Sequence, residues 1–144
     1  MIEINNLTSI PIERSFLKKI ARKILEKEKR NNLELSVALV SINKIKELNK
    51  KYCGKNRPTD VLTFNHLEFD KINIKKNLGE IVISSQEVKK NAMQLGTSFK
   101  EEMARCLIHG ILHILGYEHE NFLKGAKLME RKQNYYFSTI FKKR

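Results

Sequence analysis

Three of the four histidines in this chain lie close together, at positions 109, 113 and 119. His109 and His113 are four residues apart, and side chains at that spacing share one face of an α-helix. Gly116 follows them, and glycine adopts the left-handed backbone conformation that reverses a chain after a helix. Such a turn would bring His119 towards the other two rings. The spacing therefore predicts three imidazole ligands for one divalent ion.

Three imidazoles are typical of catalytic rather than structural zinc sites, because they leave one of the tetrahedral positions open to water. A zinc ion held in this way lowers the pKa of a bound water to about 7. The alternative for a histidine on an apolar helix is a hydrogen-bonded core residue, and here that alternative would have to hold for each of the clustered histidines. We therefore expect Zn²⁺, or another divalent metal, at His109, His113 and His119, whereas His66 is interpreted as a polar loop residue.

The same spacing, H-x-x-x-H-x-x-G-x-x-H, occurs in metzincin proteases, where a glutamate directly after the first histidine is the general base. Here that position is Gly110. Without a carboxylate to carry a proton to a leaving amine, peptide hydrolysis is disfavoured, while attack on a polyanion remains feasible. Glu118, beside the third histidine, is the only catalytic candidate, and its alternative roles are a surface carboxylate or a group that orients a histidine.

The charge of the chain points to a polyanionic partner. It has 28 lysines and arginines against 16 aspartates and glutamates, a formal net charge of +12. A basic surface binds nucleic acid by neutralising phosphates and releasing counterions. The alternative explanation is compositional bias, since lysine greatly outnumbers arginine and asparagine is abundant.

The spacing of apolar residues predicts the elements that must position the histidines. Helices are expected at 15–30, 43–52, 84–96, 98–115 and 122–140, and strands at 35–41, 61–64 and 79–83. Residues 65–77 are interpreted as a loop or a loose hairpin. Ser84 with Glu87, and Ser98 with Glu101, are predicted capping boxes. The second half of the helix at 98–115 is apolar on nearly all sides, so we expect it to be the central buried helix.

Length and composition favour a single cytoplasmic domain spanning residues 1–144, without repeats or linkers. No apolar stretch approaches the roughly 18 residues of a membrane span, and residues 1–10 do not resemble a secretion signal. The only cysteines, Cys53 and Cys106, lie far apart in sequence, which argues against a thiolate zinc site or a disulfide framework. A reducing cytosol is therefore the expected location, and the oligomeric state is left open.

The segment from His109 to His119 reads HGILHILGYEH and resembles the signature H-G-x-L-H-L-x-G-Y-D-H of the YbeY family of bacterial endoribonucleases. A second block resembles the same family in order and spacing. It comprises Leu48-Asn49, Tyr52, Gly54-Lys55, Pro58 to Phe64 and Leu78 to Ile83. The resemblance thus extends in pieces from about residue 35 to residue 120.

This resemblance implies an α+β fold, in which a small mixed sheet packs against helices and a zincin-like central helix carries the zinc ligands. It also implies RNA as the substrate and a role in the maturation of ribosomal RNA and in ribosome biogenesis. Cys53 stands where the family usually has an arginine, the expected phosphate clamp. Lys55 and Arg57 are the candidate replacements for phosphate binding, although a lysine offers a point charge rather than a bidentate fork. Glu118 and Asn65 replace the usual aspartate and proline, which bears on loop geometry.

These observations support a leading hypothesis and two alternatives. The leading one is a zinc-dependent endoribonuclease that acts on single-stranded RNA. The first alternative is a metallopeptidase-like hydrolase that uses the same ligands. The second is a binding module for RNA or the ribosome in which the metal only stabilises the fold.

Overall fold

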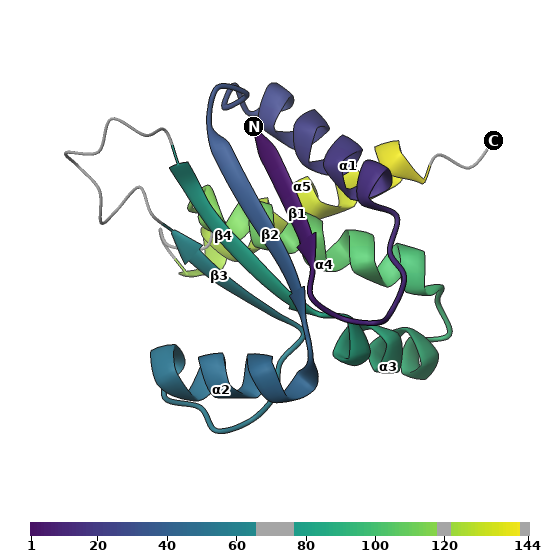
Figure 1. Cartoon of the computed structure of the whole chain (residues 1–144). Coiled ribbons are helices and arrows are strands. Elements are labelled where there is room, and N and C mark those ends of the chain that lie inside the picture. The colour runs from purple at the N-terminus through teal and green to yellow at the C-terminus, as the bar shows by residue number, and fades with distance from the viewer. Residues whose placement is uncertain (66–76, 118–121, 142–144) are drawn as a thin grey trace.

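The computed structural model describes residues 1–65, 77–117 and 122–141, which form four strands and five helices (Figure 1). In chain order they are β1 (Ile2–Asn6), α1 (Arg14–Lys27), β2 (Glu34–Val40), α2 (Ile42–Cys53), β3 (Val61–Asn65), β4 (Asn77–Ser84), α3 (Ser85–Leu95), α4 (Phe99–Ile114) and α5 (Phe122–Ile140). Each predicted helix is present with bounds close to those expected. Strand β1 was not predicted. None of the described helices combines the length and the apolar character needed to cross a membrane.

The strands form one mixed sheet in the order β1-β2-β4-β3. Strands β1, β2 and β4 are parallel, while β3 runs antiparallel to β4. Val37 of β2 lies opposite Ile4 on one side and Ile81 on the other, so buried residues line up across the sheet. Of the loop or loose hairpin predicted at 65–77, residues 66–76 lie outside the described part of the chain, while Asn65 and Asn77 belong to β3 and β4. The predicted α+β class with a small mixed sheet is confirmed.

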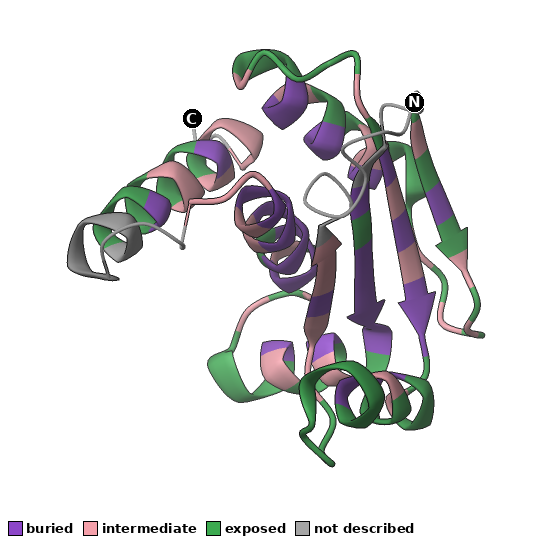
Figure 2. Cartoon of the chain, turned by 90° about the vertical axis from the view of Figure 1, so that its left-hand side faces the viewer, coloured by how far each residue is buried: buried purple, intermediate pink, exposed green. Residues whose placement is uncertain are grey.

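The main core lies between the sheet and the two helices α1 and α4. Alternate residues of β2 and β4 point into it because side chains along a strand alternate between its two faces. Helix α5 packs on the side of α4 away from the sheet, so α4 occupies the middle layer (Figure 2). The core members contributed by α1, β2, β4 and α4 include Leu17, Ile20, Ile24, Leu35, Val37, Leu39, Ile81, Ile83, Leu107 and Ile111. The prediction of a central buried helix is confirmed.

The ends of α3 and α4 are fixed by the residues that the sequence indicated. The Oγ of Ser84 accepts a hydrogen bond from the backbone N–H of Glu87 at 3.3 Å, and Ser98 accepts one from Glu101 at 3.0 Å. These bonds satisfy amides that the first turn of a helix leaves without partners. After α4, Gly116 adopts a φ of +95°, a conformation that other residues rarely take, and the chain turns there. The turn predicted at Gly116 is therefore present.

Candidate functional site

One face of α4 carries a row of polar side chains. Glu102, Cys106, His109 and His113 follow one another at spacings of three or four residues, which places them along one side of the helix. The rings of His109 and His113 are 6.2 Å apart between centroids and inclined by only 16°. One ion can bridge two rings at this separation, since zinc binds each imidazole nitrogen at about 2.0–2.1 Å. The predicted pairing of these histidines on a helix face is confirmed.

Helix α5 supplies a group that holds the first histidine. The side-chain amide of Gln133 lies within hydrogen-bonding distance of Nδ1 of His109. Metal-binding histidines usually engage a neighbour through one ring nitrogen and bind the ion through the other. This contact holds the ring, and when the amide of Gln133 turns its oxygen to accept Nδ1–H, Nε2 of His109 carries the lone pair that can bind an ion.

The third predicted ligand, His119, and the catalytic candidate Glu118 lie outside the described residues. Within the described ranges no group of three or more His, Cys, Asp or Glu side chains is close enough to hold a metal ion. The Zn²⁺ site thus remains a prediction. The two imidazoles on one helix face, one of them held through Nδ1, nevertheless fit such a site chemically.

The turn that leads towards residue 118 is tied to the rest of the fold by a buried carboxylate. Glu28, just after α1, accepts hydrogen bonds from the hydroxyl of Tyr117, from the hydroxyl of Tyr136 at 2.6 Å and from the ammonium of Lys132 at 2.9 Å. Burial alone would raise the pKa of Glu28, but these hydrogen bonds outweigh it and lower the pKa below its ordinary value. Three separate segments of the chain therefore meet at one ionised carboxylate.

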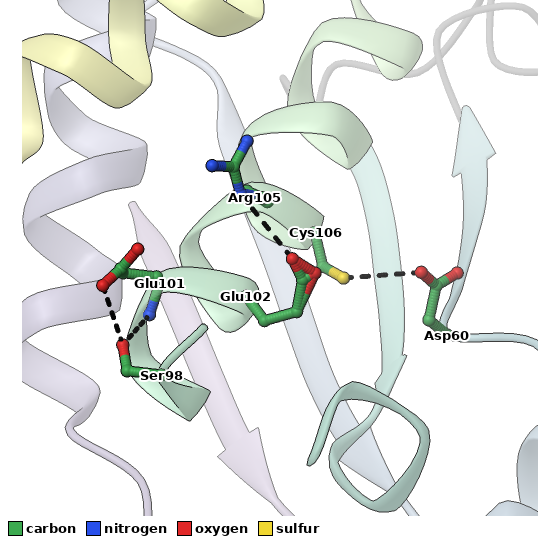
Figure 3. A network of polar contacts seen from close by, with 6 residues as sticks. All are labelled: Asp60, Ser98, Glu101, Glu102, Arg105 and Cys106. Atoms are coloured by element: carbon green, nitrogen blue, oxygen red, sulfur yellow. Dashed lines mark hydrogen bonds and ion pairs between the residues drawn. The ribbon is translucent and has the colours of Figure 1, made fainter. Parts of the chain in front are cut away.

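A cleft of about 260 Å³ opens beside His109, between α4, α5 and the start of β3. Its lining combines acidic, basic, amide, thiol and apolar groups, namely Asp60, Val61, Glu102, Arg105, Cys106, Ile108, His109, Gln133, Asn134 and Phe137. Figure 3 shows Asp60, at the start of β3, facing Cys106 and Glu102 on α4. The cleft thus continues the histidine face of α4 towards the sheet.

Asp60, Glu102 and Cys106 form one wall of this cleft, and the two carboxylates make that wall acidic. The thiol of Cys106 donates to Oδ2 of Asp60 across 3.6 Å (Figure 3). Burial, together with the charges of Asp60 and Glu102, raises the pKa of this thiol well above its ordinary value. Cys106 therefore stays protonated at neutral pH and is not a nucleophile. Glu102 has a side chain only 8% exposed and forms an ion pair with Nε of Arg105 at 3.7 Å.

The predicted phosphate-binding residues, Lys55 and Arg57, are both exposed in the loop that joins α2 to β3. Buried Asn49 shapes this loop, because its amide donates to the backbone oxygen of Arg57 at 2.9 Å. The loop ends at Asp60, which does line the cleft, whereas neither cation is among the lining residues. Their role in phosphate binding stays a prediction.

Gly110, the position of the metzincin glutamate, faces the sheet. A Cβ at this residue would lie 3.1 Å from Cγ2 of Ile81, so α4 approaches β4 more closely than a larger residue permits. A carboxylate at this position would point into the core instead of the cleft. The packing thus gives a physical reason for the glycine and disfavours a protease-like general base.

Sequence reasoning assigned no role to Asp60, Glu102, Cys106 or Gln133. Glu102 and Cys106 precede His109 at helical spacing, and this spacing could have indicated that they share its face of α4. Asp60 and Cys106 are 46 positions apart, and Gln133 and His109 are 24 apart. No local pattern connects such pairs, because only the packing of β3 and α5 against α4 brings them together.

The chain is similar to known proteins of one family. A family model described as endoribonuclease YbeY matches residues 3–140. A Persephonella marina protein with the same name is 42% identical over 129 residues, or 90% of this chain and 84% of that protein. One from Aquifex aeolicus is 42% identical over 112 residues, or 78% and 73% of the two chains. A solution structure of a Thermotoga maritima protein gives a TM-score of 0.68 at 35% identity and covers 98% of this chain and 89% of that one.

Proposed function

The chain belongs to the YbeY family of endoribonucleases, and on that premise we propose that it is a zinc-dependent enzyme that cuts single-stranded RNA during ribosomal RNA maturation. One observation supports this most directly. His109 and His113 lie together on one face of the central helix, His109 lines the cleft, and Gln133 contacts Nδ1 of His109. This is the arrangement expected of two ligands of a catalytic metal with its neighbouring support.

The proposed ligands are His109, His113 and His119. When bound, zinc would supply a Lewis acid and an activated water for attack on a phosphodiester. Gln133 holds the ring of His109 in place, and the protonated thiol of Cys106 takes no part as a nucleophile. Glu118 is the candidate for proton transfer.

Positive charge binds the substrate in this proposal. Lys55 and Arg57 neutralise phosphates of the strand, and the formal charge of +12 draws RNA to the surface. The proposed partner is ribosomal RNA, alone or within the ribosome, and the proposed location is the cytoplasm. The relatives that carry the name endoribonuclease support RNA as the substrate class and favour it over peptides.

The test combines activity with metal content. Purified wild-type protein should contain close to one zinc ion per chain and should cut an unstructured RNA, and a chelator should abolish the cleavage. His113→Ala should lose the ion and more than about a hundredfold in rate, because loss of a mere supporting group of a metal already costs about 10–100-fold. His66→Ala is the matched control, since it removes a histidine outside the cluster and should keep both the ion and the activity.

Two results would contradict the proposal. Undiminished cleavage by His113→Ala would show that the histidine cluster does not catalyse the reaction. Loss of RNA affinity and of melting temperature on chelation, with no cleavage by wild type under any metal, would instead identify a metal-stabilised binding module.

A further inference from the structure

We propose that the cleft between α4, α5 and the start of β3 is a subsite for one nucleobase, and that it selects guanine. The inference rests on the proposed function, because it places this base in the nucleotide next to the bond that is cut. His109 lines both the cleft and the predicted metal site. A base seated in the cleft therefore holds the adjoining phosphate at the histidine face of α4.

Glu102 carries a buried charge that lacks a hydrogen bond at one oxygen. Oε1 of Glu102 is inaccessible to solvent, and among the described residues it has no hydrogen-bond partner. Its ion pair with Nε of Arg105 is 3.7 Å long, too long for a hydrogen bond. Buried carboxylate oxygens in proteins normally accept hydrogen bonds, because leaving them without one forfeits their hydration. Rotation of the carboxylate would turn this oxygen into the cleft that Glu102 lines, where a ligand with N–H donors would satisfy it.

Negative charge beside Glu102 in the cleft disfavours an anionic ligand. Asp60 adds a second carboxylate, and the thiol of Cys106 already donates to it. Two carboxylates side by side repel a phosphate but accept hydrogen bonds from a neutral base. Guanine presents two adjacent donors, N1–H and the N2 amino group, to a single carboxylate, whereas uracil offers only one N–H, and adenine and cytosine only an amino group. The cleft therefore favours guanine over the other bases.

Arg105 and Phe137 form a flat surface at the rim of the cleft. The guanidinium carbon of Arg105 lies 4.0 Å from the ring centroid of Phe137, so the two groups are stacked. About half of the Arg105 side chain, 48%, remains exposed. Proteins that bind single-stranded RNA stack bases on aromatic rings and on guanidinium planes while reading the base edge with hydrogen bonds. Arg105 and Phe137 supply the first of these contacts and Glu102 the second.

Size is consistent with a single base. The cleft of about 260 Å³ is slightly smaller than the pockets of about 300–1,000 Å³ that enclose drug-sized ligands. It has room for a two-ring base, and its half-open shape leaves the sugar and phosphate outside. A longer stretch of RNA must then lie across the surface, where the basic residues are.

Nucleotide binding tests the cleft without requiring cleavage. The 5′-monophosphates of guanosine, adenosine, cytidine, uridine and inosine are titrated separately into wild type, and binding is followed by calorimetry and by amide chemical shifts. GMP should bind about tenfold or more tightly than AMP, CMP and UMP, the discrimination typical of a bidentate contact to a base. IMP, which lacks the N2 amino group, should fall between GMP and the others.

Glu102→Gln replaces one acceptor oxygen with a donor amide at constant size, and it should erase most of the preference for GMP. Glu101→Gln is the matched control, because it makes the same charge change on the same helix at a residue that faces Ser98 and does not line the cleft. It should leave the preference unchanged. In parallel, oligonucleotides with a single guanine in a uridine background should be cut next to that guanine by wild type and at scattered positions by Glu102→Gln.

The outcomes separate the base subsite from the proposed function. Equal binding of all five nucleotides by wild type, or a preference for GMP that survives in Glu102→Gln, would overturn the subsite. A uniform loss of cleavage in Glu102→Gln with unaltered base preference would overturn it too, because it would assign Glu102 to proton transfer. Selective GMP binding by a wild-type protein that never cuts RNA would support the subsite and refute the endoribonuclease activity. Cleavage of RNA without any base preference would support the activity and refute the subsite.

Discussion

Two buried carboxylates, Glu28 and Glu102, have nearly the same exposure and opposite surroundings. Their side chains are 9% and 8% exposed, respectively. Glu28 accepts hydrogen bonds from Tyr117, Tyr136 and Lys132, whereas Oε1 of Glu102 accepts none among the described residues. A buried carboxylate whose oxygens both accept hydrogen bonds has a structural role, since those bonds already offset the cost of removing its charge from water. A buried charge with an unused oxygen has capacity left for a ligand.

The hydrogen-bonded cluster around Glu28 also has a geometric role. Glu28 follows α1, Tyr117 lies in the turn after α4, and Tyr136 and Lys132 lie on α5. The cluster therefore fixes the first residues beyond α4, which lead towards the predicted ligand His119. On the cleft side, by contrast, the side chains line open space beside His109. We expect substitutions in the first region to change the stability of the fold and substitutions in the second to change what binds.

The largest expected effect is that of Glu28→Gln on stability. The variant weakens the hydrogen bonds from two tyrosines and leaves Lys132 without its partner, so the free energy of unfolding should fall by about 1.5–3 kcal/mol, the usual range for hydrogen bonds to a charged group. Urea unfolding followed by circular dichroism measures this. Glu26→Gln, at an exposed position of α1, is the control and should change stability by less than about 0.5 kcal/mol. Equal stability of the two variants would show that the hydrogen bonds of Glu28 do not stabilise the fold, and the contrast between Glu28 and Glu102 would then be lost.

The difference in stability between wild type and Glu28→Gln should depend on pH. Because the pKa of Glu28 is lowered in the folded protein, its ionised form contributes fully above the ordinary value of 4.5 and is lost as the pH falls through the lowered pKa. The stability gap between wild type and Glu28→Gln should therefore be constant from pH 7 to about pH 5 and shrink in more acidic solution. Urea titrations at several pH values, with Glu26→Gln again as control, measure this. A gap that widens with acid would mean that the wild-type carboxyl is protonated in the fold.

Gln133→Ala should affect zinc binding instead of the stability of the fold. Removing the amide that contacts Nδ1 of His109 should lower zinc affinity by about 10–100-fold, as for other supporting partners of metal ligands. Competition with a chromophoric chelator measures the affinity. Gln94→Ala, which removes an exposed amide on α3, should leave it unchanged. Unaltered zinc affinity in Gln133→Ala would show that the contact does not support a metal ligand.

The smallest expected effect is that of Glu102→Gln on stability. Neutralising this carboxylate removes a buried charge that lacks a hydrogen bond and gives up an ion pair with a half-exposed arginine, and such pairs contribute about 0–1 kcal/mol. The two terms nearly cancel, so the free energy of unfolding should stay within about 0.5 kcal/mol of wild type or rise. Thermal and urea unfolding would both reveal a larger loss. Such a loss would place Glu102 in the scaffold beside Glu28.

Local patterns were sufficient to predict most of the elements. The helical repeat of the first helix, the serine caps of α3 and α4 and the glycine after α4 each act over a few residues, so the sequence displays them directly. Strand β1 was missed because it has only Ile2 and Ile4 as alternating apolar residues among polar ones. Its strand conformation depends on pairing with β2, which no pattern within the first residues reveals.

The candidate site was predicted only where its residues share one helix. The spacing of His109 and His113 predicts their common face, whereas the sequence shows at Gly110 only the absence of a general base and not its close packing against Ile81. Glu28 follows a helix rich in lysines, and nothing near it in sequence indicates burial. Contacts between residues far apart in the chain depend on the tertiary arrangement, which residue types alone do not specify.

The position of α5 has a consequence for how the site is assembled. The walls of the cleft come from β3, α4 and α5 in that order along the chain, and α5 supplies Gln133, Asn134 and Phe137. Since a chain is made and begins to fold from its N-terminus, a nascent molecule can complete the sheet and its middle layer before the outer wall has emerged. Until α5 docks, His109 lacks its amide neighbour and the cleft lacks a side. The site therefore stays incomplete until translation has passed α5.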